Sequence, residues 1–138
     1  MSTRTYLARS AIFVLLLTTA VIVTAGYYEH PALLINQVLF IAGPSLIPFA
    51  LLSAGTMRGR SVWLVFATFL TVVWGYVAYV DSRPYQGGGA SFAVFAGWAG
   101  CVLASLVALL MVVLTRLFRV ISVMLKKHGA RDPIQAQD

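Results

Sequence analysis

The sequence predicts an all-α protein, an integral membrane four-helix bundle. Two observations carry this prediction. The first is composition: 60% of the 138 residues are hydrophobic and only 10% are charged, whereas ordinary soluble domains carry about 25% charged residues. The second is that the apolar residues form four long blocks. A helix needs about 20 residues to cross roughly 30 Å of hydrocarbon, and each block is long enough. We therefore expect the surface of the protein to face lipid.

The four blocks are the expected spans, and they cover residues of about 7–25, 33–54, 62–80 and 91–117. None shows the alternation of polar and apolar residues that marks a membrane barrel. Because backbone groups in lipid must be bonded within the protein, each block is expected to be a helix. With an amphipathic extension at about 116–127, the spans make a transmembrane domain over 1–127, followed by a loose cytoplasmic tail at 128–138.

The first block has two interpretations. Its basic start, its apolar centre and the small residues of Val23-Thr24-Ala25 near its end are also typical of a secretory signal with a cleavage site. The length of the apolar stretch and the even number of spans favour a retained helix. Both interpretations remain open from the sequence.

The distribution of charge predicts the topology. One side of the expected bundle has only one basic residue, Arg83, together with Glu29 and Asp81. The other side receives nine basic residues, which are Arg4, Arg9, Arg58, Arg60, Arg116, Arg119, Lys126, Lys127 and Arg131. Since Lys and Arg accumulate on the cytoplasmic side of membrane proteins, both termini are expected in the cytoplasm, and the expected location is the bacterial cytoplasmic (inner) membrane.

The fourth block is rich in small residues at helical spacing. Membrane helices associate through close packing of such residues, because lipid is as apolar as leucine. We expect the fourth helix to be either the central packing helix or the one that binds a partner. The candidate partner-contact face consists of Ala93, Ala96, Gly97, Gly100, Ala104 and Ala108.

The second block contains two prolines, Pro44 and Pro48, one helical turn apart. Each removes a backbone hydrogen bond and crowds the preceding turn, so a kink or local unwinding is expected there. The carbonyls that lose their donor need a partner, such as Ser45 or a neighbouring helix. Transporters use broken helices of this kind as binding sites.

The segment after the fourth block is basic and amphipathic. Apolar residues from Leu117 to Leu125 share one side of a helix, and four basic residues share the other. Such a helix suits the membrane surface, where anionic headgroups attract basic side chains. The candidate headgroup contacts are Arg116, Arg119, Lys126 and Lys127.

The loop "DSRPYQGGGASF", residues 81–92, joins the third and fourth blocks on the outer side. Pro84 stops the preceding helix, and the glycines permit a tight return. Three glycines in succession also leave bare N–H groups near the start of a helix, where an anion or a carbonyl of a partner could bind. The candidate outer-loop contact residues are Asp81, Arg83, Gly87, Gly88 and Gly89.

The sequence offers little catalytic chemistry. A single cysteine, Cys101, forms neither an intrachain disulfide nor a cysteine-based metal site, and no cofactor, metal or nucleic acid is expected. The blocks contain no acid, which argues against proton-coupled exporters. The expected function is a non-enzymatic accessory subunit that packs against another membrane protein or itself. The alternatives are an oligomeric channel or small-solute transporter lined by the second helix, and a lipid-modifying enzyme using Glu29, His30, Asp81 and Arg83.

Overall fold

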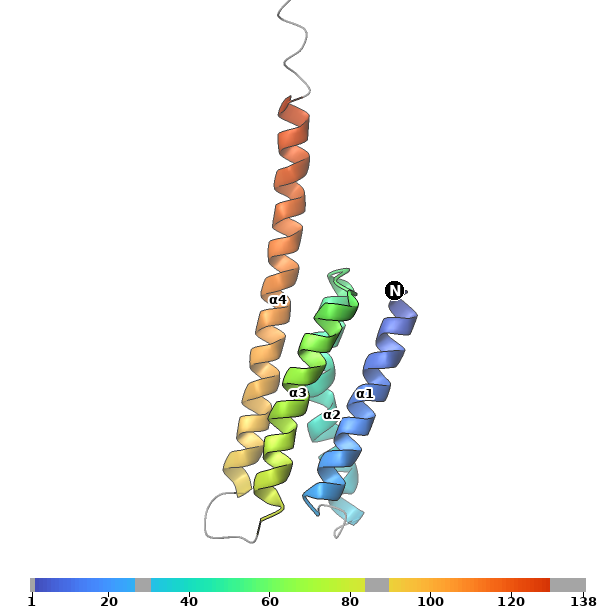
Figure 1. Cartoon of the computed structure of the whole chain (residues 1–138), viewed down its shortest axis with the longest axis vertical. Helices are drawn as coiled ribbons and strands as arrows, with labels where there is room; N and C mark the ends of the chain where they lie inside the picture. The colour runs from blue at the N-terminus through green and yellow to red at the C-terminus, as the bar shows by residue number, and fades with distance from the viewer. Residues whose placement is uncertain (1, 27–30, 84–89, 130–138) are drawn as a thin grey trace, which may run out of the picture.

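A computed structural model describes residues 2–26, 31–83 and 90–129, with the side chains of all of these except 31–33, 90–92 and 127–129. The prediction of an all-helical protein is confirmed, and each of the four helices is long and apolar enough to cross a membrane. They run in alternating directions (Figure 1). The helices are α1 (Thr3–Thr24), α2 (Pro31–Ala54), α3 (Arg60–Asp81) and α4 (Ala90–Gly129).

Local residue chemistry accounts for the helix ends. The side chain of Ser2 caps α1 by accepting a hydrogen bond from the Thr5 N–H at 3.2 Å. Gly26, with φ of +73°, follows the last turn of α1 in the left-handed conformation that glycine adopts most easily. Pro31 opens α2 at the position where a helix needs no N–H. Gly59 is the N-cap of α3.

The helices form a four-cornered bundle. Helices α2 and α3 each pack against both α1 and α4, so α1 and α4 occupy opposite corners, and α2 and α3 also meet across the diagonal. At one end of the bundle, Arg58 donates a hydrogen bond to the Thr3 hydroxyl. The Thr115 hydroxyl of α4 lies 3.5 Å from the Met57 sulfur at the same end. We call this the basic end, because Arg58 and Arg60 also lie there.

Large side chains fill the centre of the bundle. The largest fully buried ones include Tyr6 of α1, Phe49 and Leu52 of α2, and Leu70 and Trp74 of α3. Many other large apolar side chains point outward on all four helices and are half or more exposed. A bundle with an apolar surface as well as an apolar core suits surroundings that are themselves apolar.

Helix α4 is far longer than the others. Its 40 residues span about 60 Å at 1.5 Å per residue, and it leaves the bundle beyond Thr115 (Figure 1). We call residues 116–126 the projecting segment. The expected extension is therefore helical and continuous with the fourth span, while its place relative to a membrane stays a prediction. The tail expected from residue 128 lies outside the described residues, apart from 128–129 at the end of α4.

Candidate functional site

The small-residue face of α4 is used inside the chain. Ala93, Ala104 and Ala108 are buried against the bundle. A Cβ at Gly97 would lie 2.8 Å from the Trp74 ring, and one at Gly100 would lie 2.6 Å from a Val73 methyl group. The glycines therefore let α3 approach closely, as expected of a central packing helix.

Ala96 is the one member of this face that is exposed. The buried members cannot touch another protein in this fold. The partner-contact role that we expected for the face stays a prediction for Ala96 and the half-buried Gly100.

A buried hydrogen-bond chain links α3 to α2 at mid-bundle. The Trp74 indole Nε1 donates to the Ser45 hydroxyl at 2.9 Å, and that hydroxyl donates to the Ile41 carbonyl at 2.7 Å. The Cys101 sulfur of α4 lies 3.7 Å from the same hydroxyl. Three helices therefore meet around Ser45. The buried indole N–H of Trp74 needs an acceptor in a dry interior, and the Ser45 hydroxyl supplies it.

The prolines of α2 lie beside this chain. The helix remains α-helical through both Pro44 and Pro48, and the kink expected there stays a prediction. The carbonyl that Ser45 binds belongs to Ile41. It is not one of the two carbonyls, those of Phe40 and Pro44, that lose a helical donor to the prolines. Ser45 therefore serves the contact with Trp74 and not the repair of the proline sites.

A second chain of the same design lies nearer the basic end. The Trp63 indole Nε1 donates to the Ser10 hydroxyl at 3.0 Å, and Ser10 donates to the Tyr6 carbonyl at 2.9 Å. The Arg9 guanidinium lies 4.2 Å from the centroid of the Trp63 ring, within cation–π range. This chain joins α3 to α1.

The outer-loop candidates are described only in part. Asp81 is the last residue of α3. The Arg83 guanidinium lies 4.3 Å from the centroid of the Tyr79 ring and donates to the Tyr79 hydroxyl. The other candidates for contact or catalysis in the loops, Glu29, His30, Gly87, Gly88 and Gly89, lie outside the described residues. The contact role of this loop stays a prediction.

The candidate headgroup residues lie on the projecting segment. Arg116, Arg119 and Lys126 are exposed there, and the side chain of Lys127 lies outside the described residues. No acidic residue is found at the basic end among residues 2–26, 31–83 and 90–129. The charge of this end is therefore uniformly positive over the part of the chain that the structure describes.

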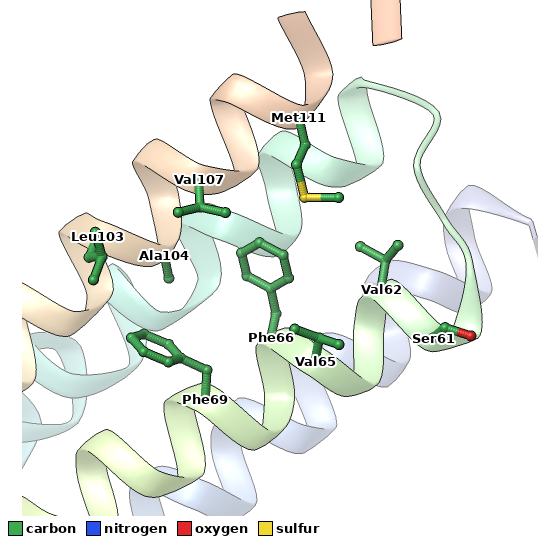
Figure 2. A pocket seen from close by; sticks show the side chains of 9 residues that line it. All are labelled: Ser61, Val62, Val65, Phe66, Phe69, Leu103, Ala104, Val107 and Met111. Carbon is green, nitrogen blue, oxygen red and sulfur yellow. The ribbon is translucent and has the colours of Figure 1, made fainter. Parts of the chain in front are cut away.

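An apolar groove lies between α3 and α4 on the outside of the bundle (Figure 2), with a volume of about 390 Å³. Phe66 and Ala104 are its most buried residues, whereas Val65 and Val107 are exposed. Ser61 supplies the one polar side chain of the lining. We call this the α3–α4 groove; its lining is Ser61, Val62, Val65, Phe66, Phe69, Leu103, Ala104, Val107 and Met111.

The two serine–tryptophan chains and the α3–α4 groove were not anticipated from the sequence. Each depends on how far one helix is shifted along its neighbour, which composition and periodicity do not specify. The sequence offers a partial signal, because the indole N–H of a tryptophan in a span needs an acceptor and serines lie within the neighbouring apolar spans. No known protein family, curated protein or solved structure matches the chain.

Proposed function

We propose that the chain is a four-span integral membrane protein with both termini in the cytoplasm, located in the bacterial cytoplasmic membrane. The support for insertion is the apolar outer surface of four helices of spanning length. The support for orientation is the basic end, where α1 begins and α4 emerges, opposite the end that carries Asp81 and Arg83. Basic residues are retained on the cytoplasmic side of a membrane.

The orientation predicts that cysteines placed at two exposed serines, at opposite ends of α3, differ in their labelling by a thiol reagent in intact cells. Ser82→Cys should react with a membrane-impermeant thiol reagent in intact cells. Ser61→Cys should react only after the cells are permeabilised. The native Cys101 is buried, so it should contribute little background labelling. Labelling of Ser61→Cys and not of Ser82→Cys in intact cells would reverse the proposed topology.

Within that membrane the protein acts as a non-enzymatic accessory subunit, which packs against a transmembrane helix of another membrane protein or of a second copy. The observation that carries this proposal is the α3–α4 groove. It is a concave site with a small residue, Ala104, at its base and the branched side chains of Val65 and Val107 at its edges. Membrane helices associate by fitting side chains into such sites.

Photo-crosslinking tests the groove. A photoreactive amino acid at position 65 should form an adduct with one defined protein in native membranes, either this chain or another. The matched control is position 72, because Val65 and Val72 are equally exposed, at 66%. They lie two turns apart on the same face of α3, and Val72 is not part of the groove lining. Adducts at position 72 should be with lipid alone.

A second pair of variants shows whether a captured protein occupies the groove. Val107→Trp should block the groove at its edge and abolish the adduct at position 65. Leu110→Trp, on exposed α4 surface outside the groove lining, should leave the adduct intact. If positions 65 and 72 both react only with lipid, the proposed subunit contact through this groove is wrong.

A further inference from the structure

The projecting segment of α4 has two faces, and each continues a face that α4 already has inside the bundle. Arg119 follows Val112 by seven residues and Ala108 by eleven, and Lys126 follows Arg119 by seven. Residues seven or eleven apart lie on nearly the same side of an α-helix. Val112 and Ala108 are buried against the bundle. The inward side of α4 therefore changes from small residues to basic ones where the helix leaves the bundle.

The outward side of α4 shows no such change. Leu117 follows the exposed Leu110 by seven residues, and Leu125 follows the exposed Leu114 by eleven. Leu117, Ile121 and Leu125 therefore extend the apolar outer surface of the bundle beyond the bundle itself. All three are about half or more exposed. An apolar strip of this kind in water would be unfavourable, so it requires a cover.

We infer that the projecting segment docks on an anionic lipid surface, with its apolar side against the acyl-chain boundary and its basic residues among the phosphates. This single occupant accounts for both faces: apolar side chains are buried, and Arg119 and Lys126 meet negative charge. An acidic protein partner would satisfy the basic face and leave the apolar one uncovered. The inference rests on the membrane insertion proposed above, and it is independent of the α3–α4 groove.

The register also fixes the direction in which the segment docks. Because its apolar side points away from the other three helices, the segment reaches the membrane by bending away from the bundle, not across it. The bend is placed at the exit from the bundle, where the Thr115 hydroxyl donates to the Met111 carbonyl at 2.8 Å. Hydroxyl bonds of this i−4 kind often accompany bends in helices.

Two fluorescent probes on the full-length protein test the inference. A polarity-sensitive fluorophore is attached to Leu125→Cys or Val123→Cys in a Cys101→Ala background. These positions are similarly exposed, at 68% and 62%, and two residues apart, so they lie on nearly opposite sides of the helix. The protein is reconstituted in phosphatidylcholine vesicles with or without phosphatidylglycerol. Co-flotation with both kinds of vesicle after alkaline carbonate extraction establishes insertion separately from docking.

With phosphatidylglycerol, the probe at 125 should shift to the blue and its quenching by aqueous acrylamide should fall several-fold, while the probe at 123 stays accessible. The effect should weaken in Arg119→Gln/Lys126→Gln and at high salt, which screens the charges. Equal accessibility at 125 in both kinds of vesicle would overturn the inference. Equal protection of the probe at 125 in both kinds of vesicle would also overturn it. In that case a crosslink between copies at position 125 would show that a second copy of the chain covers the apolar side.

Discussion

Replacing Trp74 by alanine is expected to lower the free energy of unfolding of the bundle by about 3–5 kcal/mol, the range found when a large buried aromatic residue is truncated. Trp74 is 1% exposed, at mid-bundle. Its ring lies against Gly97, and its N–H is bonded to Ser45. Its removal leaves a cavity where α2, α3 and α4 meet. Thermal or denaturant unfolding of the purified protein in mild detergent measures the loss.

Trp98→Ala is the matched control for this prediction. Trp98 is 36% exposed, and its ring centroid lies 4.5 Å from that of Phe40, so its loss should cost only about 1 kcal/mol. Equal destabilisation by the two alanine variants would contradict the position assigned to Trp74.

Two further variants separate the hydrogen bond from the packing of the ring. Trp74→Phe and Ser45→Ala each remove the bond between Nε1 and Oγ, which is worth about 0.6 kcal/mol, the average for interhelical bonds in a membrane. Trp74→Phe also loses packing, because the phenyl ring is smaller than the indole ring, so its total cost should be larger than that of Ser45→Ala. Since both changes remove the same bond, the loss in the double variant should be smaller than the sum of the two single losses by about 0.6 kcal/mol. Strictly additive losses would show that the bond between Trp74 and Ser45 does not stabilise the bundle.

Gly55→Ala is expected to lower the free energy of unfolding by about 1–3 kcal/mol, because it overpacks the contact between the end of α2 and α4. A Cβ at this position would lie 2.2 Å from one γ-carbon of Val112, 2.8 Å from the other and 3.0 Å from its β-carbon. Rotating the valine cannot clear all three atoms, and valine in a helix has essentially one side-chain rotamer. The backbones must therefore separate at the basic end.

Gly75→Ala tests the glycine substitution without the clash. No atom lies within 4 Å of a Cβ built at Gly75. The free energy of unfolding should therefore stay unchanged or rise by up to about 1 kcal/mol, because alanine has a higher helix propensity than glycine. In the double variant Gly55→Ala/Val112→Ala the smaller side chain makes room, and the loss should be less than the sum of the two single losses. If the losses caused by Gly55→Ala and Val112→Ala were strictly additive, residues 55 and 112 would not be in contact.

The sequence predicted the helices well because the physical rules involved are local. A span needs only a run of apolar residues long enough to cross the membrane. That Ala104 and Ala108 belong to a packing face also followed, since small residues at four-residue spacing favour close packing, but whether that face turns inward or toward a partner did not. These inferences require no knowledge of how one helix lies against another.

The candidate site could not be predicted, because it depends on how the helices lie against one another. Whether Trp74 or Trp98 faces the core depends on the rotation of two separate helices, which the sequence does not specify. The pairing of Trp63 with Ser10, 53 residues apart along the chain, depends on the vertical offset of α1 and α3. The α3–α4 groove depends on the offset of α3 and α4 and on the side-chain volumes at nine positions.

The two serine–tryptophan chains have a consequence for the order of assembly. Each serine gives its proton to a carbonyl of its own helix, Tyr6 for Ser10 and Ile41 for Ser45, and accepts the indole proton through a lone pair. In a single inserted helix, Ser10 of α1 and Ser45 of α2 can therefore each keep the hydroxyl proton bonded within its own helix. In both chains the unmet N–H belongs to α3, so docking of α3 on α1 and α2 is the step at which these two indoles lose their exposure to lipid.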